Sequence, residues 1–351
     1  MHPPISRDNY SRLDQYSMKL TCYIYCISIT LAFYFSQPIH PQDAQKEICI
    51  KPSINLISEI SSANFSNQEK GFFSVVLDLI TGEDKLTIVK PFSIYAATDG
   101  SLYFLDQDNK SLILIDEEEN EIENLFPDDL QCESLVGLCS TESGLLITDS
   151  QNNKILKYEY ESEEVREFNI SLDQPTGIAY IKSKNEIWVC ETKNHRIIRL
   201  DKYGNKLGTI GQRGITLGEF NFPTFIWADN KGKVYVNDSM NFRVQIFSED
   251  GSLLSAFGKA GDGSGDFARP KGIATDSYGH IYVADALFNN IQVFNQEGQL
   301  LYTFGERGTD QGQFWLPAGI YISRTNTIYI ADSFNSRIQI FQLECDENSK
   351  N

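Results

Sequence analysis

Residues 269–304 read RPKGIATDSYGHIYVADALFNNIQVFNQEGQLLYTF and contain four short apolar segments. The segments are GIATD, HIYVAD, NIQVF and LLYTF, and the residues between them include Gly, Asn and Asp. Short runs rich in Ile, Val, Tyr and Phe, bounded by turn residues, are typical of β-strands and leave no room for a helix. The stretch therefore predicts four antiparallel strands joined in sequence order.

The same pattern recurs along the chain. It appears as FPTFIWADNKGKVYVNDSMNFRVQIFSEDGSLLSAFG at 222–258 and as LPAGIYISRTNTIYIADSFNSRIQIF at 316–341. An acidic residue ends the second segment of each unit, and successive acids are 42 to 47 residues apart. A regular period of this length indicates a repeat architecture. Six units are predicted, and their acids are Asp106, Asp149, Glu191, Asp238, Asp285 and Asp332.

The second segment of each unit is apolar almost throughout, as in KVYVND, TIYIAD and EIWVCE. A sheet with one face in water would alternate polar and apolar residues, so both faces of each small sheet are expected to be covered. Sheets stacked face to face around an axis meet this requirement and leave only short, protected edges. We therefore predict an all-β fold, a six-bladed β-propeller with four-stranded antiparallel blades.

The repeated unit resembles the NHL repeat over roughly Phe72 to Leu343. The resemblance rests on P-x-G-I-A, I-Y-V-A-D, N-x-R-I-Q-V-F and the Gly-rich link F-G-x-x-G-x-x-x-G-x-F, which recur in register. The first two units depart from it, because they lack the Gly-rich link and have shorter connections. The first segment of a unit is entered at Pro91, Pro175, Pro223, Pro270 and Pro317, with Ser134 in this place in the second unit.

The sixth unit supplies three strands and stops at Phe341. The segment FFSVVLDL, Phe72–Leu79, precedes the first unit and has no other partner. We predict that it pairs beside Arg337–Leu343 and closes the ring. The predicted organisation is a signal peptide or N-terminal anchor at 1–44, a linker at 45–70, an NHL-type propeller at 71–345 and a tail at 346–351.

The N-terminal stretch Leu20–Phe35 is uncharged, follows Lys19, and is shorter than the ~20 residues of a full membrane span. It predicts a signal peptide and export to the periplasm, the extracellular space or a membrane-anchored position. Membrane contact is expected only through this segment, if it is not cleaved. After its removal five cysteines remain, of which Cys49 and Cys345 flank the propeller and could form a disulfide in an oxidising compartment.

Negative charge is concentrated in the first two units. Asp78–Glu167 contains 22 acidic and 6 basic residues, whereas 171–351 contains 20 and 18. Some NHL-repeat proteins bind single-stranded RNA through a basic face, and this charge distribution argues against nucleic acid as a partner. A solvated acidic rim or attraction for a basic partner are the remaining interpretations.

The six repeated acids raise the possibility of a ring of metal ligands. They end second strands, however, about 4.8 Å outside the strands that line the channel, so acids of opposite blades cannot share one calcium ion. Asn recurs three residues after most of these acids, and Lys or Arg five residues after four of them. We therefore predict structural turn acids that bond nearby backbone N–H groups, with no metal ligands and no catalytic residues among them.

Enzymatic alternatives find little support in the residues. Zinc-dependent amidating lyases that resemble NHL propellers need several histidines, and only His195 and His280 remain after the signal. Calcium-dependent lactonases place Glu, Asn and Asp at the channel mouth, and the first segments here are mainly Gly, Ile, Ala, Tyr and Thr. A calcium-dependent hydrolase of lactones or esters is nevertheless kept as the alternative function, with calcium as its cofactor.

The preferred interpretation is a non-catalytic propeller without a cofactor that binds a protein, peptide or glycan through its loop face. The fourth position after each acid varies among the units although the surrounding frame repeats. Variable residues on a repeated frame are suited to recognition. The predicted binding residues are His195, Arg196, Arg213, Asn241, Phe242, Arg243, Phe288, Asn289, Arg307, Phe334, Asn335 and Arg337.

Overall fold

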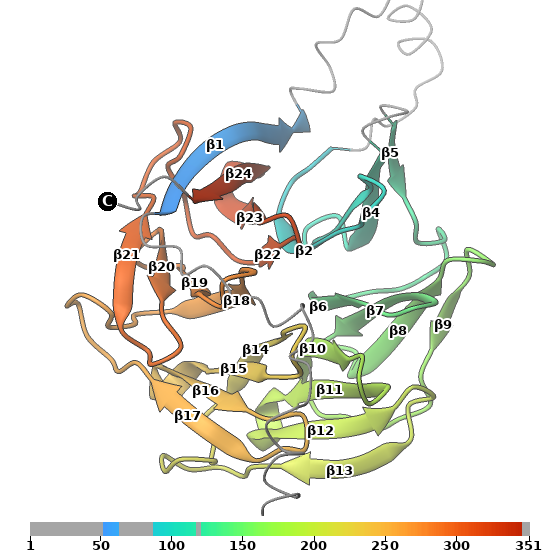
Figure 1. The fold of residues 1–351 in the computed structure, drawn as a ribbon. Helices are drawn as coiled ribbons and strands as arrows, with labels where there is room; N and C mark the ends of the chain where they lie inside the picture. Colours follow the sequence, from blue (N-terminus) through green and yellow to red (C-terminus); the bar gives the residue numbers. More distant parts are fainter. Residues whose placement is uncertain (1–51, 63–86, 117–120, 346–351) are drawn as a thin grey trace, which may run out of the picture. The chain divides into compact units, whose positions relative to one another are not determined.

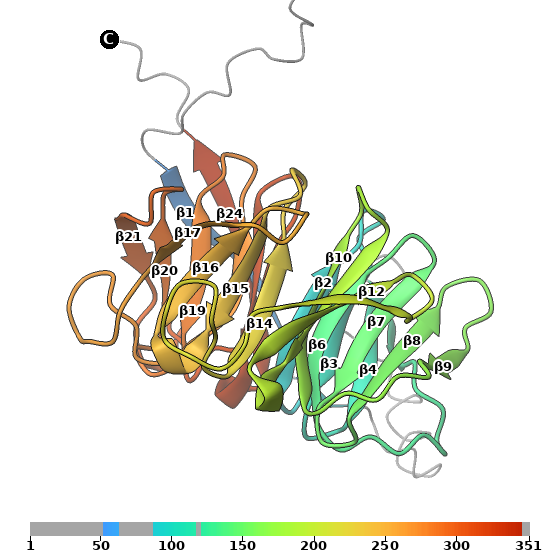
Figure 2. The same ribbon diagram turned by 90° about the horizontal axis from the view of Figure 1, so that it is seen from below.

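The computed structural model describes residues 52–62, 87–116 and 121–345. The predicted signal peptide at 1–44 and the tail at 346–351 lie outside these residues. The described residues form six four-stranded antiparallel sheets, arranged as blades in a ring (Figure 1). Figure 2 shows the same ring turned by 90°, with the innermost strands β2, β6, β10 and β14 near its middle. The fold class predicted from the sequence is confirmed.

Each blade follows the chain from the channel outward. Blade 1 contains β2 (Pro91–Ala96), β3 (Leu102–Asp106), β4 (Ser111–Asp116) and β5 (Glu121–Asn124). Blade 2 contains β6 (Leu135–Ser140), β7 (Gly144–Asp149), β8 (Lys154–Glu159) and β9 (Val165–Glu167). Blade 3 contains β10 (Pro175–Ile181), β11 (Glu186–Glu191), β12 (Arg196–Asp201) and β13 (Lys206–Ile210).

The remaining blades have the same order. Blade 4 contains β14 (Pro223–Ala228), β15 (Val234–Asp238), β16 (Arg243–Phe247) and β17 (Leu253–Phe257). Blade 5 contains β18 (Pro270–Thr275), β19 (Ile281–Asp285), β20 (Asn290–Phe294) and β21 (Leu300–Phe304). Blade 6 contains β22 (Ile320–Ile322), β23 (Thr327–Asp332), β24 (Arg337–Cys345) and, on its outer edge, β1 (Pro52–Ser61). Short 3-10 helices follow three second strands: η3 (Thr192–Asn194), η4 (Ser239–Asn241) and η5 (Ser333–Asn335).

The ring is closed by an N-terminal strand, as predicted, but the strand is β1 and not Phe72–Leu79. β1 pairs antiparallel with β24 and places Ile60 opposite Ile338. It lies within the stretch that the sequence analysis assigns to a linker, whereas Phe72–Leu79 lies outside the described residues. An outermost strand needs only one apolar face, and β1 accordingly mixes polar residues with Ile54, Leu56 and Ile60. The prediction that the more apolar segment FFSVVLDL closes the ring is therefore wrong.

The proline register of the second blade also differs by one residue from the prediction. Leu135 pairs with Asp149, as Pro175 pairs with Glu191 and Pro270 with Asp285. Leu135 and not Ser134 therefore begins the first strand of blade 2.

First strands of neighbouring blades approach each other closely around the channel. A Cβ atom added to Gly272 would lie 2.5 Å from the backbone oxygen of Ala318, and one added to Gly177 would lie 2.5 Å from that of Thr224. The backbone N–H of Gly272 donates to the Ala318 oxygen at 2.9 Å. Glycine is therefore required at these two positions, where neighbouring first strands approach closely.

The core lies between the blades. One apolar cluster joins Trp188 and Cys190 of β11 to Val234 and Val236 of β15, and all four side chains are buried. Because each second strand contacts a neighbouring blade on both faces, its residues are apolar throughout. No helix in the described part of the chain has the length and apolar character that a membrane span requires.

Cysteine usage agrees in part with the sequence analysis. Cys345 is disulfide-bonded, whereas Cys132, Cys139 and Cys190 are free. Cys49, the partner predicted for Cys345, lies outside the described residues. Burial raises the pKa of the Cys190 thiol, which is fully buried, so this thiol is a packing residue and not a nucleophile.

Candidate functional site

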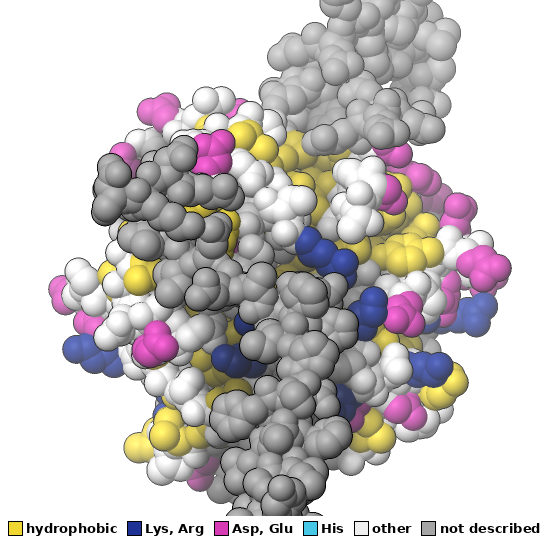
Figure 3. Space-filling model, in the orientation of Figure 1, with side chains coloured by type: hydrophobic (Ala, Val, Ile, Leu, Met, Phe, Trp, Pro, Cys, Tyr) yellow, Lys and Arg dark blue, Asp and Glu magenta, His cyan; other side chains and the backbone are white. Residues whose placement is uncertain are grey.

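A cavity of about 860 Å³ lies where the first strands begin, at one mouth of the central channel. All six blades contribute to it through the starts of their first strands and the turns after their second strands. We call it the channel-mouth cavity. Its size is within the range of small-molecule and cofactor pockets, about 300–1,000 Å³. Figure 3 shows Lys and Arg side chains next to hydrophobic ones near the middle of the ring, with acidic side chains mainly toward its rim.

The second position of the P-x-G motif, or of its counterpart Leu135–Gly137 in blade 2, supplies much of the wall. This position is Phe92, Val136, Thr176, Thr224 and Lys271 in the first five blades, and all five residues line the cavity. Phe92 of blade 1 and Phe225 of blade 4 come from opposite sides of the ring, and their ring centroids lie 5.8 Å apart. These two aromatic rings bridge the channel from opposite blades.

A second aromatic group lies further along the first strands. Tyr321 packs edge-on against Tyr95 at 5.4 Å and against Trp227 at 5.7 Å, measured between ring centroids. Trp227 Nε1 donates to Thr275 Oγ1 at 3.0 Å. Aromatic side chains from blades 1, 4 and 6 meet inside the ring and fill this part of the channel. The channel-mouth cavity is therefore closed on its inner side.

Three cationic side chains line the channel-mouth cavity: Lys90, Arg269 and Lys271. Lys271 Nζ lies 5.0 Å from the centre of the Phe92 ring, and Lys90 Nζ lies 5.6 Å from that of Phe334. Lys90 also pairs with Asp108 at 3.4 Å, whereas Lys271 and Arg269 form no ion pair within the described residues. Burial, together with the charges of Arg269 and Lys90, lowers the pKa of Lys271 to about 8.

Three bulky apolar residues of the cavity adopt left-handed backbone conformations. Their φ angles are 53° for Phe222, 54° for Phe242 and 51° for Leu316. Such conformations are uncommon for large side chains, and they persist only where the surroundings enforce them. The backbone N–H of Phe222 donates to His195 Nδ1 at 3.1 Å, and that of Leu316 donates to Asn289 Oδ1 at 2.9 Å. Side chains of the preceding blades thus hold apolar residues toward the cavity.

The six repeated acids bond to backbone N–H groups. Asp285 accepts from the N–H groups of Ala268, Arg269, Leu287 and Phe288 at 2.7 to 3.3 Å. Asp332 accepts from the Trp315 N–H at 2.8 Å and also from side chains of its own blade. The acids therefore tie the entrance of each first strand to the end of the second strand. No group of three or more His, Cys, Asp or Glu side chains suited to a metal ion occurs among the described residues.

Several predicted binding residues are used inside the protein. Arg243 binds the carboxylate of Asp238 and three backbone oxygens of the preceding Gly-rich link, and Arg337 has the corresponding contacts in blade 6. The Asn241 amide donates to Gly214 O and the Asn335 amide to Gly308 O, at 3.0 and 2.9 Å. These four side chains contribute to the framework of the loop face.

The variable position of each turn has a shared backbone geometry. Lys110, Asn153, His195, Phe242, Asn289 and Ser336 all have φ between 52° and 61°. In four of the six blades the side chain hydrogen-bonds to the backbone at the entrance of the next blade; these residues are Asn153, His195, Asn289 and Ser336. Phe242 has no polar side-chain atom and instead lines the channel-mouth cavity.

The remaining predicted residues divide by position. Phe334 lines the channel-mouth cavity with Phe242, whereas Phe288 is not among its lining residues. Arg213 and Arg307 are exposed on the Gly-rich links and do not line the channel-mouth cavity. Arg196 lines a different cavity in blade 3.

Sequence reasoning missed Lys90, Phe92, Arg269 and Lys271. The signal was present, because the second position of P-x-G varies most, with Phe, Val, Thr, Thr, Lys and Ala in the six units. It includes one aromatic residue and one cation, in a chain whose first segments are otherwise apolar or small. The described lining residues of the cavity include no carboxylate. The calcium-dependent hydrolase, which the sequence left open, stays a prediction.

Comparisons with known proteins agree with the fold. The family model of the NHL repeat matches residues 172–200 and 314–341, and a model described as a 6-bladed beta-propeller matches residues 226–285. No curated protein matches this chain.

Solved structures with the same fold have distant sequences. An auxiliary nutrient binding protein from Bacteroides ovatus ATCC 8483 is 14% identical with a TM-score of 0.60, over 74% of this chain and 71% of that chain. Virginiamycin B lyase from Staphylococcus aureus is 14% identical with a TM-score of 0.56, over 84% of this chain and 100% of that chain. At these identities the likeness shows the fold alone. With its repeats matched in blades 3 and 6 and its ring complete, the chain is a six-bladed β-propeller with NHL repeats.

Proposed function

We propose that this propeller is an exported, non-catalytic binding protein that takes an acidic peptide segment with an apolar side chain in the channel-mouth cavity. The observation that carries the proposal is the combination of apolar walls with Lys90, Arg269 and Lys271, and no acidic side chain among the described lining residues. Among a protein, a peptide and a glycan, an acidic peptide best satisfies both the charge and the apolar surface.

Two further observations support the proposal. Lys271 is held against Phe92 without an acidic partner among the described residues, and a partly buried, unpaired cation is stabilised by a ligand carboxylate. Solved structures of the same fold include proteins described as auxiliary nutrient binding proteins. Export is supported by the predicted signal peptide and by the disulfide at Cys345, since disulfides persist in oxidising compartments.

The test compares the peptides Ac-Glu-Phe-Glu-NH2 and Ac-Gln-Phe-Gln-NH2 by calorimetric titration of the protein. We expect the acidic peptide to bind more tightly, and Lys271→Gln to weaken its binding about tenfold or more, because a charged hydrogen bond contributes about 1.5–3 kcal/mol. Lys259→Gln is the matched control, because Lys259 is 78% exposed outside the cavity. Equal binding of both peptides, or an unchanged affinity in Lys271→Gln, would overturn the proposal.

The pH dependence provides an independent arm. Because the pKa of Lys271 is lowered to about 8, the ammonium group is lost as pH rises through about 8 in the free protein. The affinity for the acidic peptide should therefore fall as pH increases from 7 to 9, and Lys271→Gln should lack this decrease.

A further inference from the structure

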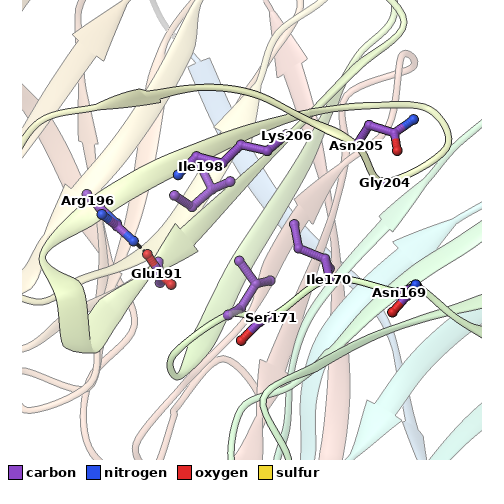
Figure 4. A pocket seen from close by; sticks show the side chains of 10 residues that line it. Asn169, Ile170, Ser171, Glu191, Arg196, Ile198, Gly204, Asn205 and Lys206 are labelled. Carbon is purple, nitrogen blue, oxygen red and sulfur yellow. Dashed lines mark hydrogen bonds and ion pairs between the residues drawn. The ribbon is translucent and has the colours of Figure 1, made fainter.

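A second cavity, of about 310 Å³, lies on the outer side of blade 3. We call it the blade-3 cavity. It is bounded by the link that enters the blade, by the end of β11, and by β12 with the turn that follows it (Figure 4). This cavity is separate from the channel-mouth cavity, with which it shares no lining residue.

The blade-3 cavity occupies a place that other blades fill with their own chain. Residues 211–222 join β13 to β14, and residues 258–269 join β17 to β18, so each of these links has twelve residues. The link into blade 3 is residues 168–174, which are only seven. Leu172 also stands where the longer links place Phe220, Phe267 and Phe314, three residues before the position at which the next first strand is entered. A shorter link with a smaller buried residue leaves the space open.

The arginine that faces this space lacks the partners of its counterparts. In blade 4, Arg243 donates from its terminal nitrogens to the backbone oxygens of Ile215, Thr216 and Glu219 at 2.7 to 2.9 Å. In blade 6, Arg337 donates to those of Asp310 and Gln313 at 2.8 and 3.0 Å.

In blade 3, Arg196 has one hydrogen-bonding contact within the described residues, from Nε to the carboxylate of Glu191. The Arg196 side chain is 36% exposed, compared with 12% for Arg243 and 8% for Arg337. Both of its terminal nitrogens are therefore available to acceptor oxygens of a ligand.

Other residues of the blade-3 cavity define what that ligand would be. Lys206 is exposed and forms no ion pair in the described part of the chain; in Figure 4 its side chain extends along Ile198 toward the side where Arg196 lies. Ile170 and Ile198 provide apolar surface, and Ile198 takes the place of Gln245 and Gln339, whose amides bind the longer links. Glu191 is already satisfied by Arg196 and by the Asp173 N–H at 3.0 Å. A positive end and an apolar wall favour a small anion with an apolar body.

We propose that the blade-3 cavity is a binding site for a small organic carboxylate. Its carboxylate oxygens take the place that the link's backbone oxygens occupy in blades 4 and 6, and they bind the terminal nitrogens of Arg196 and the ammonium of Lys206. The apolar body lies against Ile170 and Ile198. A volume of about 310 Å³ suits a chain of a few carbon atoms.

The test is titration of the ¹⁵N-labelled protein with hexanoate, followed by amide NMR, with hexanamide as the neutral comparison. We expect hexanoate to shift the amides of Ser171, Gly204 and Asn205, and hexanamide to shift them far less. Arg196→Gln should weaken hexanoate binding at least fivefold. Lys206→Gln, an exposed substitution that does not threaten the fold, should weaken it at least twofold.

The control is Lys271→Gln, which alters only the channel-mouth cavity and should leave hexanoate binding in blade 3 unchanged. Three results would overturn the proposal: equal shifts with hexanamide, shifts at Ser171, Gly204 and Asn205 that are as large in Arg196→Gln and Lys206→Gln, or hexanoate shifts confined to residues of the channel-mouth cavity.

Discussion

Replacing the repeated acids one blade at a time distinguishes the contribution of the ion pair with arginine from that of the hydrogen bonds to backbone N–H groups. Asp332 is fully buried and accepts from Arg337 Nε, the Asn335 amide and the Trp315 N–H, each at 2.8 Å. Asp285 is equally buried but has Asn290 where blade 6 has Arg337, so its partners are neutral backbone N–H groups. The substitutions Asp332→Asn and Asp285→Asn are isosteric, and they differ in whether a buried cation is left behind.

The expected magnitudes follow from these partners. Removing one member of a buried ion pair costs about 3–5 kcal/mol. Arg337 keeps a second contact with Glu59 at 3.1 Å, so we expect Asp332→Asn to cost about 3 kcal/mol, at the lower end of that range. Asp285→Asn turns one acceptor into a donor that faces backbone N–H groups, which costs about 1–2 kcal/mol. The difference in free energy of unfolding should be about 1–2 kcal/mol.

Urea unfolding followed by circular dichroism measures both variants against the wild-type protein. The double variant Asp332→Asn, Arg337→Gln should recover part of the loss, because it removes the buried cation that has lost its Asp332 partner. If Asp285→Asn is as costly as Asp332→Asn, and the double variant recovers nothing, the ion pair does not contribute and the backbone bonds alone explain the repeated acid.

Three other substitutions probe the framework. Burial and the nearby Arg213 lower the pKa of His195, so the unfolded chain binds more protons than the folded one near pH 6. The stability of the protein should therefore fall as pH decreases through about 6.5. In His195→Asn, which keeps an acceptor, thermal unfolding should lose this pH dependence. Ile60→Ala should cost about 2–5 kcal/mol in urea unfolding because Ile60 is buried in the apolar cluster between blades 6 and 1, whereas Ile57→Ala, at a side chain 57% exposed, should cost little. Gly272→Ala should lower the melting temperature far more than Gly208→Ala, since a Cβ at Gly208 meets nothing within 4 Å.

The sequence predicts the blades because one pattern is repeated in register, and each copy supports the others. The closing strand could not be recognised in the same way, because β1 occurs once and has only one buried face. Its partial apolar character in Ile54, Leu56 and Ile60 resembles that of an ordinary linker. The pairing with β24 is a contact between residues nearly 300 positions apart, which local periodicity does not reveal.

The residues of the candidate sites could also be predicted from the sequence only in part. The second-strand acids and the turn residues were conspicuous in the sequence because they recur, and the structure uses most of them to hold the backbone. Lys271 was overlooked because it occurs in one unit only. Its surroundings depend on Phe92, which is far away in sequence and on another blade. A residue that is exceptional within its repeat is a better indicator of a site than one that recurs.

This distinction explains why both cavities lie where the repeat is broken. The second-strand acid is present in each blade, so a change there weakens the joint between the first and second strands. The second residue of the first-strand motif and the length of the link are under weaker constraint. The ring closes with Phe, Val, Thr, Lys or Ala at this residue, and with links of seven residues into blade 3, ten into blade 2 and twelve into blades 4 and 5. Binding residues can be placed at these positions with little loss of stability. The channel-mouth cavity is lined by the variable residue of the first-strand motif, and the blade-3 cavity results from a short link.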